Sequence, residues 1–169
     1  MKVLATFDGS EFAESTLREL AIIAGLPNAE ITLLAVADEP RGRRRGVREI
    51  PIAASDDLLG RGTGVIVQAP APDFAETKGQ AVERRAHELE DYLRTLVGRL
   101  PAGPHYEVEA HVAPDAAATI IERAEAERVD LIVMATHSRG GLTHALFGST
   151  TEQVIRSGVA PVLVVHPKR

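Results

Sequence analysis

The 169-residue chain contains no cysteine. It can therefore form no disulfide, no thiolate metal site and no cysteine nucleophile, a composition typical of a reducing compartment. No apolar run approaches the ~20 residues that a membrane-spanning helix needs. The segment MKVLATFD holds too few apolar residues for the apolar region of a signal peptide. We therefore expect a cytoplasmic protein with no membrane partner.

Aromatic residues and positive charge are also scarce. Aromatics make up 4% of the chain, so the core is expected to be aliphatic. The formal net charge of −5 provides no overall attraction to nucleic acid, and we expect no nucleic-acid partner. The composition does not exclude a small-molecule ligand. The length is close to that of one domain, and we expect a single domain over residues 1–169.

Five short segments are apolar on successive residues, which is typical of buried parallel strands. The third alternates more than the others. The expected strands are Val3 to Phe7, Glu30 to Val36, Tyr106 to Val112, Leu131 to Thr136 and Pro161 to His166.

Helical patterns lie between these strands. The expected helices run from about Ala13 to Ala24, about Ala75 to about Leu100, Asp115 to about Glu127, and Ser149 to about Gly158. Ser10 is a candidate cap for the first helix, and Gly25 and Pro27 are expected to end it. The alternation predicts an α/β fold, an open five-stranded parallel sheet with helices on both faces.

One long connection breaks this regularity. Residues 38–74 mix charge, glycine, proline and small residues, and we expect a long flexible insertion there, with the stretch from Arg41 to about Phe74 the most mobile. Its arginine cluster is expected to be a solvated loop or, alternatively, an arm that meets nucleotide phosphates or an acidic partner. Asp56 and Asp57 lack the spacing of a magnesium site.

The segment THSRGGLTHALFGSTTEQV, residues 136–154, leads into the last predicted helix. Ser149-Thr150-Thr151-Glu152 matches a capping box, in which Ser149 would accept the Glu152 amide. The same helix start offers unpaired amides that suit a phosphate, and both interpretations can hold together. The segment matches neither the common G-x-x-x-x-G-K-[ST] phosphate loop nor the G-x-G-x-x-G dinucleotide motif.

Several motifs in one order resemble the universal stress protein family. They are ATFDGSEFAE, DLIVMATH, RGGL, LFGSTTEQVIR and VAPVLVVHP, and together the resemblance covers roughly residues 1–37 and 76–167. It implies the sheet order 3-2-1-4-5. Family members that bind ATP carry Gly, two residues, Gly, nine residues, then Gly followed by Ser or Thr. This chain keeps Gly148 and Ser149 but has Ala135 and Ser138 at the two earlier glycine positions.

The resemblance also implies a binding site. Asp8 would sit beside the ribose or base, and a Thr stands two places before it where many members have Pro or a similar residue. With strand order 3-2-1-4-5, Asp8 and the segment before the last helix meet at a crevice where ligands of open α/β sheets collect. The candidate binding residues are Thr6, Asp8, Val36, Met134, Ala135, His137, Ser138, Arg139, Gly140, Gly148, Ser149 and Thr150.

Other chemistry finds little support in the sequence. The six histidines lack metal-ligand spacing, so no metal site is expected, and His137 is a better candidate for donation to a phosphate. Ser149, His137 and Asp8 do not match a known triad motif, and no catalytic residues are assigned.

The leading hypothesis is a stress-response protein that binds ATP or another adenine nucleotide, with Mg²⁺ as a candidate companion ion, and acts as a nucleotide-dependent interaction module. The alternatives are a dimeric interaction protein that binds no nucleotide, and a slow ATPase, for which no base is evident. The apolar segment PVLVVH predicts a homodimer through the last strand. The downstream partner is not predicted.

Overall fold

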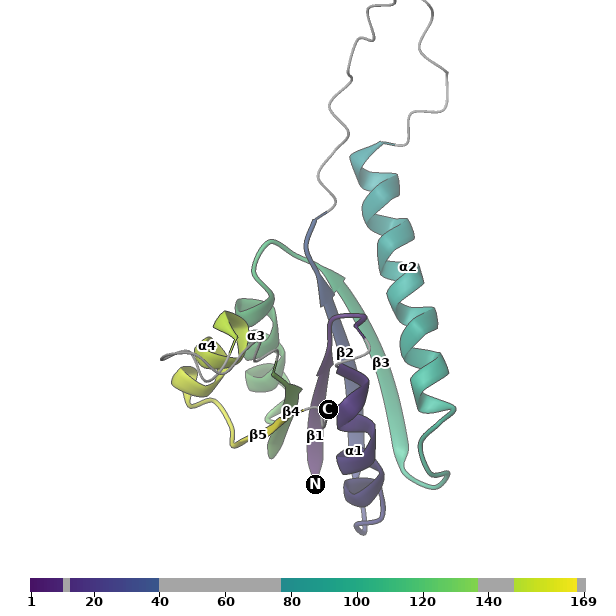
Figure 1. Cartoon of the computed structure of the whole chain (residues 1–169), viewed down its shortest axis with the longest axis vertical. Helices are drawn as coiled ribbons and strands as arrows, with labels where there is room; N and C mark the ends of the chain where they lie inside the picture. The colour runs from purple at the N-terminus through teal and green to yellow at the C-terminus, as the bar shows by residue number, and fades with distance from the viewer. Residues whose placement is uncertain (11–12, 40–76, 137–147, 167–169) are drawn as a thin grey trace, which may run out of the picture.

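The computed structural model describes residues 1–10, 13–39, 77–136 and 148–166. It contains one parallel sheet of five strands in the order β3-β2-β1-β4-β5 (Figure 1). The elements in chain order are β1 (Lys2–Phe7), the 3-10 helix η1 (Ala13–Thr16), α1 (Leu17–Ala24), β2 (Glu30–Ala37), α2 (Lys78–Val97), β3 (His105–Val112), α3 (Ala116–Glu127), β4 (Leu131–Ala135), α4 (Ser149–Ser157) and β5 (Val162–Val165). The predicted fold class and strand order are confirmed.

The sheet separates two apolar layers because successive strand residues point to opposite faces. Val3, Ala5 and Phe7 of β1 pack in a cluster with residues of α1 and α2. Leu4, between them, packs with residues of α3 and α4. Both faces are therefore covered, which explains why these strands are apolar on successive residues. Figure 1 shows α1 and α2 on one side of the sheet and α3 and α4 on the other.

The order of the strands reverses at β1. This strand pairs with β2 on one side, with Phe7 opposite Ala35, and with β4 on the other, with Thr6 opposite Met134. All pairs are parallel, so the carboxyl ends of these strands share one edge of the sheet. The helices that follow β1 and β4, α1 and α4, lie on opposite faces of the sheet, and this arrangement opens a crevice between the two strands at this edge.

Some helix ends follow local sequence signals. Gly25 ends α1, as predicted, and Asp115, the expected start of α3, is its N-cap residue. Ser10 does not cap α1, because the 3-10 helix η1 intervenes. The Ser10 backbone and hydroxyl oxygens instead accept from the Ala13 amide at 3.1 and 3.3 Å, at the start of η1.

The predicted flexible insertion at 38–74, with its arginine cluster and Asp56-Asp57, lies almost wholly outside the described residues, which stop at Glu39 and resume at Thr77. Its mobility therefore stays a prediction. Within the described ranges, no helix combines the length and the apolar character needed to cross a membrane.

Candidate functional site

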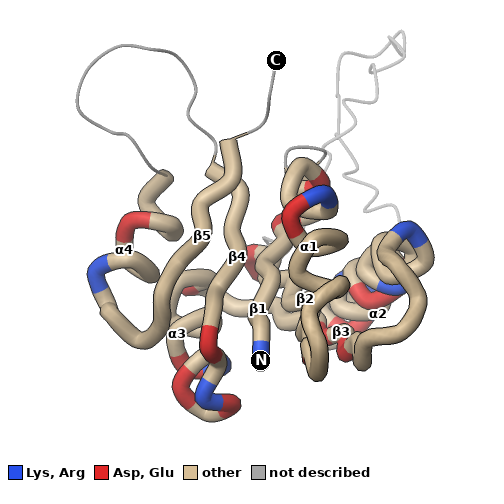
Figure 2. The backbone as a smooth tube through the Cα atoms, turned by 90° about the horizontal axis from the view of Figure 1, so that it is seen from below, with Lys and Arg blue, Asp and Glu red and all other residues tan. Residues whose placement is uncertain are grey.

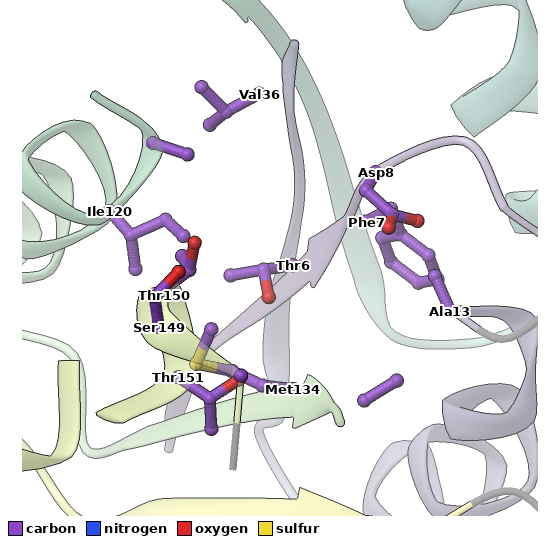
Figure 3. Close-up of a pocket in the computed structure, with 13 residues that line it drawn as sticks. Thr6, Phe7, Asp8, Ala13, Val36, Ile120, Met134, Ser149, Thr150 and Thr151 are labelled. Atoms are coloured by element: carbon purple, nitrogen blue, oxygen red, sulfur yellow. The ribbon is translucent and has the colours of Figure 1, made fainter. Parts of the chain in front are cut away.

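A cavity of about 260 Å³ lies at the carboxyl ends of β1 and β4 (Figure 3). Its walls come from the ends of three strands, from the first two turns of α3 and from the first turns of α4 and η1. The residues that line it are Thr6, Phe7, Asp8, Ala13, Val36, Ala116, Ile120, Met134, Ala135, Gly148, Ser149, Thr150 and Thr151. The cavity is therefore built by the strand reversal at β1.

Asp8 stands directly after β1, in a turn that fixes its carboxylate. Its Oδ1 accepts hydrogen bonds from the Ser10 amide at 2.9 Å and from the Ser10 hydroxyl at 2.6 Å. The turn passes through Gly9 at φ +81°, a left-handed conformation that favours glycine. The sequence Asp-Gly-Ser thus holds a carboxylate at the rim of the cavity.

Helix α4 begins at the cavity without a side-chain cap. Gly148 is the N-cap residue, and its carbonyl accepts the Glu152 amide at 2.9 Å. The predicted capping box at Ser149 is therefore wrong, because the helix starts one residue too early for Ser149 to occupy the cap. In a helix of this phase, the amides of Ser149, Thr150 and Thr151 have no acceptor within the helix. They give this wall of the cavity a partial positive charge.

Gly148 has no conformational need to be glycine. Its φ of −63° suits any residue, and a Cβ added there would meet no described atom within 4 Å. The missing side chain therefore leaves open space directly beside the three amides. An anion could approach the backbone closely at this position.

One part of the cavity lining is apolar. It consists of the side chains of Val36, Ile120 and Met134, which are all less than 9% exposed. Among them lies Thr6, which is 8% exposed and whose side chain points into the cavity (Figure 3). The wall could therefore hold a flat apolar group that carries a polar edge.

Charged residues near the Asp8 turn form ion pairs with one another. Glu14 of η1 forms an ion pair with Arg99, which follows α2. Burial, together with the charges of Glu14 and Asp8, raises the pKa of Tyr92 on α2 to about 12. Tyr92 is therefore neutral at physiological pH. Arg85 of α2, near the Gly9 turn, is paired with Glu88.

A second polar cluster joins β3 and α3, and it does not line the cavity. Glu107, Glu109 and Glu127 bring carboxylate oxygens within 4.8 Å of one another. Arg123 forms ion pairs with Glu109 and Glu127. Burial acts to lower the pKa of Arg123, but the hydrogen bond and charge of Glu109 and the charge of Glu127 outweigh it and raise this pKa. These residues form an ion-pair network at the β3 edge of the sheet.

The cavity brings together eight of the twelve residues that the sequence nominates. They are Thr6, Asp8, Val36, Met134, Ala135, Gly148, Ser149 and Thr150. His137, Ser138, Arg139 and Gly140 lie outside the described residues, and their roles stay predictions. Sequence reasoning missed Phe7, Ala13, Ala116, Ile120 and Thr151. Ile120 had a signal, since its helical stripe predicts an inward position, but nothing local ties it to this end of the sheet.

Comparison with known proteins agrees with this architecture. A sequence model of the universal stress protein family matches residues 64–166. The universal stress protein MJ0577 of Methanocaldococcus jannaschii is 30% identical over 168 residues, which cover 99% of this chain and 95% of that protein. The solved structure of MJ0577 superposes with a TM-score of 0.68 at 26% identity, over 99% of this chain and 96% of that one.

A further solved structure shares the fold at lower identity. It is a universal stress protein in complex with cAMP, with a TM-score of 0.54 at 16% identity, covering 98% of this chain and 96% of that one. Four observations agree. They are the resemblance seen in the motifs, the strand order 3-2-1-4-5, the match to the family over most of the chain, and the near full-length similarity to the archaeal protein. This chain belongs to the universal stress protein family.

Proposed function

We propose that the chain binds an adenine nucleotide in the cavity between β1 and β4 and acts in the cytoplasm as a nucleotide-dependent interaction module of the stress response. One observation carries the proposal: the uncapped first turn of α4, the Asp8 turn and an apolar wall line a single cavity. These three features match the three parts of a nucleotide. The cAMP complex of a protein with the same fold supports the choice of ligand.

Each part of the nucleotide has a candidate partner. The phosphate would accept hydrogen bonds from the amides of Ser149 and Thr150, in the space that Gly148 leaves open. The base would pack on the apolar wall around Met134 and Val36. By the family resemblance, Asp8 would accept a hydrogen bond from the ribose.

Binding is favoured over hydrolysis. Asp8 is the only ionisable side chain among the described residues that line the cavity. Its Oδ1 already accepts two hydrogen bonds from Ser10. A general base must direct an acceptor at a water molecule beside the phosphate. The phosphate would lie at the start of α4, away from Asp8. We therefore propose a binding protein and not an ATPase.

The alternative is an interaction protein that binds no nucleotide, and one observation favours it. Ala135 lines the cavity with a methyl group where ATP-binding relatives have glycine. The decisive experiment begins with protein unfolded and refolded to remove ligand. Calorimetric titration with ATP, AMP and cAMP should then give saturable heat with at least one of them. No heat and no thermal stabilisation at millimolar concentrations of all three would favour the alternative.

We also propose a homodimer through β5. This strand pairs only with β4 in the described sheet, so its outer edge has no strand partner there. Leu163 on it is 38% exposed, an unusual feature for a large apolar residue at a sheet edge. Light scattering at micromolar concentration should give twice the 18.1 kDa chain mass. The single-chain mass would refute the dimer without bearing on the cavity.

A further inference from the structure

We propose that Glu107 and Glu109 close the β3 edge of the sheet to strand pairing, so that a second copy of the chain joins through β5 and assembly stops at the dimer. The inference rests on the proposed β5 dimer and goes beyond it, because it assigns a role to the opposite edge. Figure 1 shows β3 and β5 at the two edges of the sheet. In the described sheet β3 pairs only with β2, and β5 only with β4.

The two edge strands differ in length and in charge. Strand β3 has eight residues, and Glu107, Glu109 and His111 lie at alternate positions, so their side chains share one face. Strand β5 has four residues, all of them Val or Leu. A long edge strand offers a row of backbone groups to any other strand, and charged side chains commonly protect such an edge. The longer edge carries these charges and the shorter edge carries none.

Glu109 is an inward-pointing charge at the β3 edge. Its side chain is 17% exposed and forms an ion pair with Arg123 of α3, which also pairs with Glu127. The His111 Nε2 atom lies 3.5 Å from a carboxylate oxygen of Glu109. Glu107 is exposed, and it has a carboxylate oxygen within 4.8 Å of those of Glu109 and Glu127. Charges held between an edge strand and a helix in this way oppose the addition of a further strand.

A second copy would meet these charges directly if it paired through β3. A two-fold axis perpendicular to the sheet makes the two strands antiparallel, and residues directly opposite then share a face. In the registers with the most pairs, Glu107 would lie opposite Glu109 of the second copy, or Glu109 opposite its own equivalent. Like charges directly opposite destabilise a strand pair. The same pairing of β5 places only Val and Leu opposite one another.

The difference between the edges determines where assembly stops. If both edges could pair, dimers joined through β5 would join again through β3, and the sheet would extend without limit. A pairing of β3 with β5 would also extend without limit. It would bury the β3 carboxylates beside Leu163 and its aliphatic neighbours, which is unfavourable. Closure of the β3 edge leaves the two-fold dimer as the end product.

The test is a double variant, Glu107→Thr with Glu109→Val, compared with the unmodified protein by light scattering and sedimentation at several micromolar concentrations. The unmodified protein should keep the dimer mass. The mean mass of the variant should rise with concentration to at least about twice that of the unmodified protein. The matched control is Glu122→Thr with Glu125→Val, at two exposed positions of α3. It removes the same charge from the helix surface and should keep the dimer mass.

A second variant avoids the loss of an Arg123 ion pair. Glu107→Thr alone leaves both pairs in place and should raise the mean mass in the same direction, by less. Thermal unfolding shows which variants fold, and the single variant decides if the double variant does not. Folded edge variants that keep the unmodified mass, or an equal rise in the control, would overturn the inference. A monomeric unmodified protein would refute the β5 dimer instead, and the edge variants should then still exceed its mass.

Discussion

The N-terminus of α4 differs from those of α2 and α3. Thr77 and Gln80 form a reciprocal capping box at α2, in which the Thr77 hydroxyl accepts the Gln80 amide at 3.2 Å and the Gln80 side chain accepts the Thr77 amide at 2.9 Å. Asp115 accepts the Ala118 amide at 3.0 Å at α3. Helix α4 begins with glycine and has no such acceptor. A side chain therefore accepts one amide at the start of α2 and one at the start of α3, whereas no side chain caps α4, whose first residues line the cavity.

This contrast indicates what each helix start does. Capped amides stabilise the fold, because each cap contributes about 1 kcal/mol. Uncapped amides at a cavity contribute little to the fold of the free protein but provide hydrogen bonds to an incoming anion. Helix α4 carries Glu152 in its first turn and Arg156 in its last, and the two form an ion pair. Figure 2 shows this acidic and this basic position along the backbone of α4.

The largest expected effect comes from Gly148→Val. A side chain there would fill the open space beside the amides, so nucleotide affinity should fall at least about a hundredfold. The melting temperature should stay within a few degrees, because a Cβ added at Gly148 meets no described atom within 4 Å. Calorimetry and thermal unfolding measure the two quantities.

The matched control is Gly79→Val, in the first turn of the capped helix α2. Its added Cβ would lie no closer than 4.0 Å to the described atoms around it. Nucleotide affinity should be unchanged by this variant. An equal loss of affinity in both variants would mean that the effect is general and does not arise at α4.

The next effect separates stability from binding. Asp115→Ala should lower the free energy of unfolding by about 1 kcal/mol, because an amide of α3 loses its acceptor. Ser149→Ala should leave the free energy of unfolding of the ligand-free protein within about 0.5 kcal/mol, since Ser149 caps nothing. Its hydroxyl, on a residue that lines the cavity, would donate to the phosphate beside the backbone amide, so the change should weaken nucleotide binding by about 1 kcal/mol for one lost hydrogen bond. If urea unfolding shows that both variants lose the same free energy of unfolding, Ser149 acts as a helix cap after all.

A smaller effect is expected from Thr6→Val, a change of similar shape that removes the hydroxyl. The hydroxyl belongs to a residue that lines the cavity, so its loss should change the free energy of unfolding of the ligand-free protein by less than about 0.5 kcal/mol. The same change should weaken nucleotide binding, whereas Thr6→Ser should preserve it. A destabilised Thr6→Val protein with unchanged affinity would show that the hydroxyl serves the fold.

The smallest effect is on the Asp8 side of the cavity and depends on pH. The pKa of Tyr92 is raised from 10.0 to about 12, so the folded state holds this proton more tightly than the unfolded state. The resulting stabilisation is complete below pH 10 and is lost as the pH rises toward 12. Because Tyr92 is partly exposed, the loss should be under about 1 kcal/mol. Tyr92→Phe should remove this part of the pH dependence in urea unfolding measurements.

Local patterns predicted most of the fold. The boundaries of β1 and β2 fall within one residue of those expected from their apolar runs, because burial on both faces requires such runs. Asp115 marked the start of α3 because its side chain accepts an amide three residues ahead. The strand order did not follow from periodicity and came from the family resemblance.

The errors have a common physical origin. The start of α4 at Ser149 was predicted correctly, but its cap was placed at Ser149 and lies at Gly148. The phase of this helix buries Thr151 and Val154, and a local motif does not encode that burial. Ala116 and Ile120 reach the cavity only because α3 packs beside the end of β1. Such a contact depends on the tertiary arrangement and leaves no mark at nearby sequence positions.

The central claim is that the first amides of α4 bind a nucleotide phosphate while those of α2 do not. Amide NMR spectra recorded during titration of ligand-free protein with AMP test it most directly. The account predicts saturable shifts at Ser149, Thr150 and Thr151, with the Lys78, Gly79 and Gln80 signals unmoved. Absence of any shift at α4 in millimolar AMP and millimolar ATP, or equal shifts at the two helices, would contradict it.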